Sequence, residues 1–307
     1  MLLIILFDCA FIGSILKVEG VVSVLGYFIL ILFVGLSDPA QILQPPAGAP
    51  LPGMSEELLD RFLKGKESYI RVIEPEEGLG PILNQQSCAS CHNNPVGGPG
   101  AQTVIRFGRV DKKGGFQSLG HLGGSLFQSQ SIDDNCLEII PQEANIQTNR
   151  LTNGSIAFGL VESLSDEYIL LLQSNQPISQ RGVVHWVNSL ENPNAPLRIG
   201  KFGWKSQLAT VLDFSADASR EELGFTNRIL PDEVAPNGNI DLLEECDLVL
   251  DPEDGPDKEG FDFIDRVTDF QRFLGVPPQT PKSGMTGENI FNQIGCSVCH
   301  VSNLITS

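Results

Sequence analysis

Two short stretches of this 307-residue chain place two thiols and an imidazole at a spacing that could hold a haem. Each reads C-x-x-C-H, and the members are Cys88, Cys91 and His92, then Cys296, Cys299 and His300. In c-type haem attachment the two cysteines bond to the vinyl groups and the adjacent histidine binds the iron. A chance match is expected on the order of 0.002 times per chain of this composition, so two matches predict two covalently bound haem c groups.

Zinc is the alternative ligand for these cysteines, because paired C-x-x-C motifs can build a tetrahedral metal site. Zinc ribbons usually place their pairs closer together than the roughly 200 residues that separate the two pairs here. Haem is therefore favoured over a zinc-binding structural module, and iron analysis with a pyridine haemochrome assay separates the two.

The charge balance narrows the classes of partner. The chain carries 38 acidic and 20 basic residues, for a net charge of −18. Such a chain repels phosphate backbones, so we expect no nucleic-acid partner. A neutral or positively charged partner protein, such as a small redox donor, is favoured instead.

The N-terminal region indicates export. Residues 1–37 are predicted to be a signal peptide or a membrane anchor, because residues 1–36 are almost entirely apolar. Small residues at Gly35 and Ser37 suit a signal-peptidase site, which favours the signal peptide. Residues 38–54, rich in proline, alanine and glycine, are predicted to be a linker. We expect a periplasmic or otherwise exported protein that touches a membrane only through this segment, if it is uncleaved.

The remaining pattern predicts a mainly α fold with long loops and a few short strands. Apolar spacing predicts helices over residues 56–64, 88–92, 164–173, 207–214 and 261–274, and one from Thr286 into Cys296. Ser55 and Ser165 are expected to cap the first and third of these helices. Short strands are expected over residues 103–109 and 115–119.

An acidic run interrupts this pattern. Residues 232–265 hold thirteen acidic side chains and a single lysine, and we expect residues 232–260 to be a solvated insertion. The stretch from Asp251 to Glu259 is a candidate calcium loop, although it lacks EF-hand spacing.

These segments predict two cytochrome-c-like haem domains. The first is expected over residues 55–231 and the second from residue 261 to 307, with the acidic insertion between them. A cytochrome c domain normally continues for several tens of residues past its motif, whereas seven residues follow His300 here. We therefore expect the second domain to be C-terminally truncated.

Further stretches resemble those of the bacterial di-haem oxidoreductase family, relatives of di-haem cytochrome c peroxidase. They are residues 78–81 before the first motif, 159–162, 201–207, and 270–278 leading into residues 291–300. The resemblance implies that one haem reacts with peroxide while the other passes electrons from a donor protein. The alternative is a di-haem electron-transfer cytochrome without catalysis. The relatives' distal methionine, which follows the motif of the electron-transfer haem, has no counterpart after His300.

Several residues outside the motifs are candidate ligands or relays. His121 could be a distal haem ligand, a proton relay during peroxide cleavage, or an ordinary loop residue. His185 is expected to be half-buried and structural, and neither Met54 nor Met285 is a strong sixth ligand. Trp204 could pass electrons between the haems or pack in the core.

Two carboxylates and two cysteines complete the candidates. Glu162 or Glu143 could supply protons to peroxide, although surface carboxylates are the more common outcome. Cys136 and Cys246 could form a disulfide in an exported protein, but their distance is not visible from the sequence. Glycine-rich loops after the first motif predict that the first haem is the reactive one and the second the electron entry point.

Overall fold

The computed structural model describes residues 46–276 and 286–306. The predicted leader, the linker up to residue 45, and Met285 lie outside these ranges. Across the described ranges, every helix is too short or too polar to cross a bilayer.

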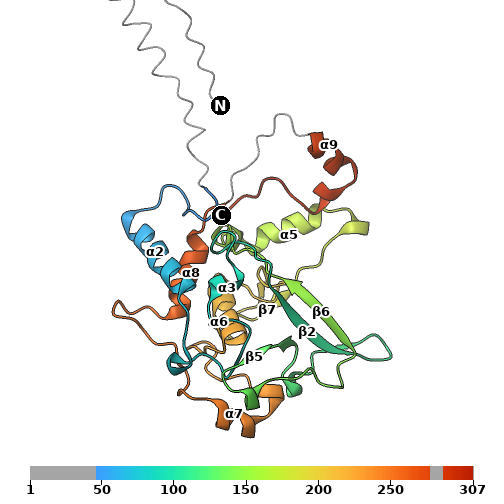
Figure 1. Ribbon diagram of the computed structural model, residues 1–307. Coiled ribbons are helices and arrows are strands. Elements are labelled where there is room, and N and C mark those ends of the chain that lie inside the picture. The colour runs from blue at the N-terminus through green and yellow to red at the C-terminus, as the bar shows by residue number, and fades with distance from the viewer. Residues whose placement is uncertain (1–45, 277–285, 307) are drawn as a thin grey trace, which may run out of the picture. The chain divides into compact units, whose positions relative to one another are not determined.

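Helices are the main regular structure, as expected, with 36% of the described residues helical and 13% in strands (Figure 1). They are α2 (Glu56–Ile70), α3 (Cys88–Cys91), α4 (Phe158–Glu162), α5 (Asp166–Asn175), α6 (Val211–Leu223), α7 (Ile240–Cys246), α8 (Phe263–Phe273) and α9 (Thr286–Gln293).

The strands are short except for one antiparallel ribbon. They are β1 (Ile82–Leu83), β2 (Thr103–Val110), β3 (Phe116–Gln117), β4 (Leu126–Phe127), β5 (Gln130–Ser131), β6 (Ile146–Leu151), β7 (Trp186–Val187) and β8 (Arg198–Ile199). Strand β2 pairs with β6 along six residues, and it also pairs with β3 and β4. The expected strands near residues 103–109 and 115–119 are thus present, the second in shortened form.

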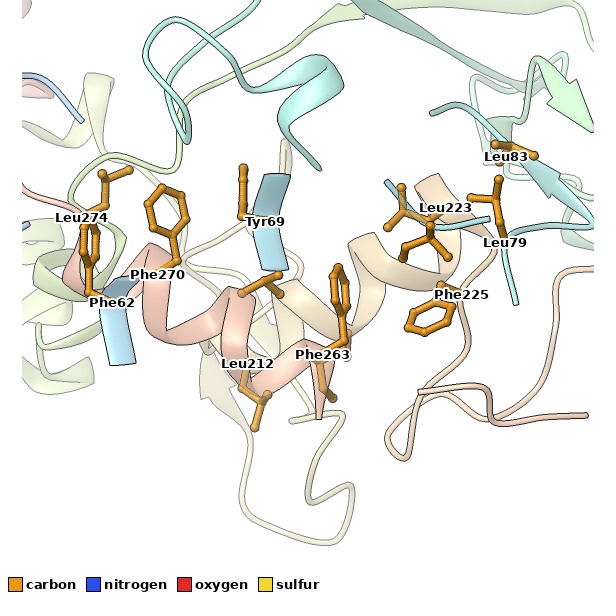
Figure 2. Packing of buried hydrophobic residues seen from close by; sticks show 14 residues of the cluster. Phe62, Tyr69, Leu79, Leu83, Leu212, Leu223, Phe225, Phe263, Phe270 and Leu274 are labelled. Atoms are coloured by element: carbon orange, nitrogen blue, oxygen red, sulfur yellow. The ribbon is translucent and has the colours of Figure 1, made fainter. Parts of the chain in front are cut away.

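The main core lies where α2 packs along α8, as Figures 1 and 2 show. The ring of Phe270 lies 5.2 Å from that of Phe62 and 4.8 Å from that of Tyr69. Gly65 lets the two helices approach, because a side chain there would collide with the backbone oxygen of Arg266. Helix α8 was expected to open the second haem domain, and it shares this core with the helices around the first motif.

Capping residues fix where the helices begin and end. Ser55 caps α2 and Ser165 caps α5, each accepting from a backbone N–H three residues on, as predicted. Helix α6 differs from its expected range, because Thr210 caps it and Gly224, with φ of 64°, ends it. It therefore runs to residue 223 rather than stopping near 214.

The acidic run is not simply a solvated insertion, because several of its carboxylates have structural partners. Asp254 is 6% exposed and accepts from the backbone N–H groups of Phe263 and Ile264, at 2.7 and 3.1 Å, at the start of α8. Arg266 pairs with Asp257 at 2.6 Å and with Glu259 at 2.9 Å. Acidic side chains are favourable here because they face a helix N-terminus and a buried guanidinium.

The two cysteines left open by the sequence form a disulfide. Cys136, in a 3₁₀ turn, is bonded to Cys246 at the end of α7, with the Cα atoms 6.2 Å apart. The bond joins residues 110 apart in sequence and so ties the acidic region to the β-strand region.

Candidate functional site

The first C-x-x-C-H motif occupies a single capped helical turn. Ser87 begins α3, and its hydroxyl accepts from the N–H of Ser90 at 3.2 Å. The backbone N–H of His92 donates to the carbonyl oxygen of Cys88 at 3.0 Å. Both cysteines and the histidine of this turn line the same cavity.

Glycines after the motif let segments of the protein approach one another closely. A side chain at Gly100 would collide with the carbonyl oxygen of Cys91. Gly97 has φ of 80° and lies against the side chains of Phe270 and Leu274. The loop is thereby held on the core while the motif's side chains face the cavity.

The cavity has a volume of about 340 Å³, which lies within the usual range for bound small molecules. Its lining comes from α3, α6, the β2–β6 ribbon and the loop 201–208. Phe158, Phe202 and Phe214 form an aromatic cluster beside it, with ring centroids 5.0–6.4 Å apart.

The donor groups at the cavity fit a covalently attached haem. Burial lowers the pKa of His92, which favours the neutral imidazole that binds metals, and its Nδ1 is buried without a hydrogen-bond partner. Burial raises the pKa of Cys88 to about 12 and that of Cys91 to about 11, and both are free thiols. The Tyr69 ring packs edge-on against His92 at 6.2 Å and limits its movement.

One side of the cavity carries three carboxylates, which we call the acidic wall: Asp217, Glu221 and Glu222 of α6. Burial, reinforced by repulsion from Glu221, raises the pKa of Asp217 to about 6. Burial also raises the pKa of Glu222, which accepts from the side-chain amide of Asn84 at 2.9 Å. Glu221 is paired with Arg220 at 2.7 Å.

Sequence reasoning missed the acidic wall. The available signal was the spacing of Phe214, Asp217, Ala218 and Glu221, which puts them on one face of a helix. The predicted helix stopped at residue 214, so that face could not be recognised.

Another side of the cavity carries Arg106 of β2 and Arg150 of β6, which we call the basic wall. Arg106 donates to the hydroxyl of Ser125 at 3.2 Å, and Arg150 donates to that of Thr148 at 2.8 Å. The Arg150 guanidinium lies 5.8 Å from the ring of Trp204, which is 46% exposed at the cavity edge. Trp204, for which the sequence left electron transfer and core packing open, lies in the cavity lining.

The second motif shares one backbone hydrogen bond with the first but differs in its local backbone, because left-handed Gly295 rather than a capping serine precedes it. It lies after α9 in a 3₁₀ turn (Cys296–Val298), and His300 donates to the carbonyl oxygen of Cys296 at 2.9 Å. The His300 ring lies 5.7 Å from that of Phe291. Cys299 and His300 are exposed, in contrast to the first motif.

A family model described as "Di-haem oxidoreductase, putative peroxidase" matches residues 126–307. The chain belongs to this di-haem oxidoreductase family. No curated protein and no solved structure matches it.

The range matched by the di-haem oxidoreductase family model contains the second motif, Trp204 and the acidic wall. The first motif precedes this range in the sequence. Assignment of the first haem therefore depends on the motif itself and on the cavity. Within the described residues, the cysteines and histidines of the two motifs do not form a cluster of the kind that a shared zinc site would need.

His121 does not lie at the cavity of this oxidoreductase. It is exposed in a 3₁₀ turn (Gly120–Leu122) that packs against another turn (Pro236–Gly238), where Gly238 leaves room for the carbonyl oxygen of His121. His121 is not among the residues that line the cavity at the first motif. The expected distal or proton-relay role is therefore not supported by its position.

The other candidate acids and the second free histidine have structural or surface positions. Glu162 accepts from both Nε and Nη2 of Arg272, at 2.7 and 3.0 Å, and from the first N–H of α6 at 2.7 Å. Glu143 is exposed and does not line the cavity. His185 is exposed rather than half-buried, with Nδ1 3.2 Å from the carbonyl oxygen of Lys205.

A second polar cluster lies in the acidic run. Glu233, Asp251 and Glu253 bring carboxylate oxygens within 4.8 Å of one another, beside the hydroxyl of Thr226. Burial, followed by repulsion within the cluster, raises the pKa of Glu233 to about 10, and burial raises that of Glu253 to about 7. Of the predicted calcium loop, only Asp251 and Glu253 take part.

Proposed function

We propose that this di-haem oxidoreductase is exported and reduces peroxide at a haem c bound to Cys88, Cys91 and His92. Electrons would arrive from a small redox protein through a second haem c bound at Cys296, Cys299 and His300. The observation that carries the proposal is the cavity at the first motif. It combines two free thiols and a neutral imidazole with a separate wall of ionisable carboxylates.

When bound, the haem would supply the iron at which peroxide accepts electrons. Reduction of hydrogen peroxide to two waters also takes up two protons, and the acidic wall is suited to deliver them. Asp217, with a pKa of about 6, exchanges its proton near neutral pH. Asn84 orients the Glu222 carboxylate through its hydrogen bond of 2.9 Å.

Trp204 is placed to assist electron transfer. It lies at the cavity edge and is 46% exposed, so one edge can face the haem while the other faces a partner. The net charge of −18 favours a basic donor protein and association that weakens with added salt.

Ligand binding at the first haem tests the proposal against a purely electron-transferring cytochrome. A peroxidase-like site should give a high-spin spectrum and bind cyanide, because its distal position is open or can open. Two haems that stay low-spin and ignore cyanide would favour the electron carrier instead. The protein must first contain two covalent haems by the pyridine haemochrome assay.

Calcium binding was predicted for the stretch from Asp251 to Glu259, and we propose instead the cluster of Glu233, Asp251 and Glu253, which shares two residues with that stretch. A divalent cation would relieve the repulsion that contributes to the raised pKa of Glu233. Added calcium should raise the melting temperature of the wild type and leave that of Glu233→Gln unchanged. Equal shifts in both proteins would place any calcium elsewhere.

A further inference from the structure

The pairing of β2 with β6 puts two arginines on the cavity side of the ribbon. Arg106 is opposite Thr148, and Arg150 is opposite Val104, so the arginines are diagonal neighbours on the same face. Diagonal neighbours are about 7–8 Å apart, close enough for two long side chains to act on one ligand. Arg109 lies three residues beyond Arg106, has the opposite side-chain parity, and is exposed.

Both guanidiniums retain donors for a ligand. Each has five N–H donors, and among the described residues neither forms an ion pair with a carboxylate. Arg150 is oriented by Thr148 and by the face of Trp204, and Arg106 is oriented by Ser125. Lys201 also lines the cavity, but it is turned away and donates to the carbonyl oxygen of Leu164 at 2.5 Å.

The charges in the cavity come from two different elements, and Arg106 is close enough to Asp217 and Glu222 that its positive charge opposes the rise in the pKa of each. The basic wall belongs to the β-ribbon and the acidic wall to α6. A ligand that carries carboxylates is attracted to the ribbon and repelled by α6. A haem attached through its vinyl groups has two such carboxylates, on its propionate side chains.

We propose that Arg106 and Arg150 bind the propionates of the haem held at Cys88 and Cys91, and so set the orientation of the porphyrin. This inference rests on the proposed function, because it assumes a haem at the first motif. Guanidiniums suit the task, since they stay charged and bind carboxylates through two parallel hydrogen bonds. Their positive charge also stabilises the reduced haem relative to the oxidised one.

The test uses full-length protein with both haems attached and three single variants: Arg150→Gln, Arg106→Gln and the control Arg109→Gln. Two quantities are measured in each, namely covalent haem per chain and the two reduction potentials by optical titration. We expect one potential to shift downward in Arg150→Gln and in Arg106→Gln. Neither potential should move in Arg109→Gln, because that side chain faces away from the cavity.

A charge-preserving variant separates electrostatics from packing. Arg150→Lys should keep the potential closer to that of the wild type than Arg150→Gln does. If Arg150→Gln cannot be obtained with haem attached, the reduction potentials of Arg106→Gln and Arg150→Lys are compared with those of the wild type instead. Full haem content with both potentials unchanged in the two Gln variants would overturn the inference. A wild-type chain without haem at the first motif would instead overturn the proposed function.

A free organic carboxylate is the alternative ligand for Arg106 and Arg150, because it carries the same charged group as a haem propionate. Benzoate serves as the probe, and its binding to the wild type is followed by the haem spectrum. If Arg150→Gln loses benzoate binding and keeps its potential, the basic wall binds a carboxylate substrate and the propionate assignment is wrong. If benzoate fails to bind while the potential falls, the propionate assignment stands.

Discussion

Replacement of Asp217 by asparagine should slow peroxide turnover and at the same time stabilise the folded protein at neutral pH. Asp217 faces the cavity, where burial and then repulsion from Glu221 raise its pKa from 3.8 to about 6. In the unfolded chain this carboxyl ionises near its ordinary pKa. Ionisation at neutral pH therefore costs the folded state about 3 kcal/mol relative to the unfolded one.

The sign of the pH dependence follows from which state releases the proton first. As pH rises from about 4 to about 6, the unfolded chain loses this proton before the folded protein does, so stability falls. Asp217→Asn has no such proton and keeps nearly the same shape. It should gain up to about 3 kcal/mol near pH 7 and only a small fraction of that near pH 4.

Thermal unfolding of the haem-containing protein at both pH values measures this gain. Each kcal/mol corresponds to roughly 2–4 °C in Tm for a chain of this size. Asp232→Asn, at an exposed position in the loop between α6 and α7, is the matched control and should leave Tm unchanged. Peroxide turnover by Asp217→Asn should fall by about 10²-fold or more, the usual contribution of a positioned proton donor.

Two results would refute the reasoning. If Asp217→Asn is less stable than the wild type near pH 7, the carboxylate is stabilised in the fold rather than strained by burial. If peroxide turnover is unchanged, protons reach the haem by another route. Glu222, whose pKa burial also raises, would then be the next residue to replace.

Three further predictions follow from the motifs and the disulfide. Cys88→Ala should remove most covalent haem at the first site and Cys296→Ala at the second, visible as lost haem staining on a denaturing gel; unchanged staining after loss of all four motif thiols would contradict haem attachment. His92→Gly should abolish peroxide turnover but leave the second haem reducible, whereas His300→Gly should slow reduction by the donor; stopped-flow spectra with the reverse pattern would exchange the two roles. Cys246→Ser should lower stability by about 2–5 kcal/mol in denaturant unfolding, because the bond closes a loop of 110 residues; an unchanged unfolding midpoint would mean that the bond does not constrain the unfolded chain.

Local signals in the sequence predicted local structure well. Ser55 and Ser165 begin helices because a hydroxyl can satisfy a free backbone N–H one turn ahead, a relation confined to four residues. The motif spacing likewise predicted one helical turn at Cys88. Long-range pairings were not predictable in this way. The pairing of Arg150 with Val104 depends on strand register, and the partner of Cys136 lies 110 residues away.

The candidate catalytic residues show the same limit. His121 was attractive because histidine transfers protons near neutral pH and lies in a glycine-rich loop after the first motif. Its loop is held by the turn at Pro236–Gly238, a contact that no local pattern reveals. Asp217 has an ordinary side chain for a surface helix, and only its placement in the cavity raises its pKa to about 6.

The two motifs have the same sequence pattern in different surroundings, so comparing them shows which features depend on each. In both, the histidine N–H donates to the carbonyl oxygen of the first cysteine, at 3.0 Å for His92 and 2.9 Å for His300. Burial lowers the pKa of His92, and its ring packs against Tyr69, whereas His300 is exposed. The C-x-x-C-H pattern that the two motifs share therefore accounts for this common hydrogen bond and for the haem attachment proposed at each motif. The chemistry expected of the first haem has to come from the cavity around it, and above all from its acidic and basic walls.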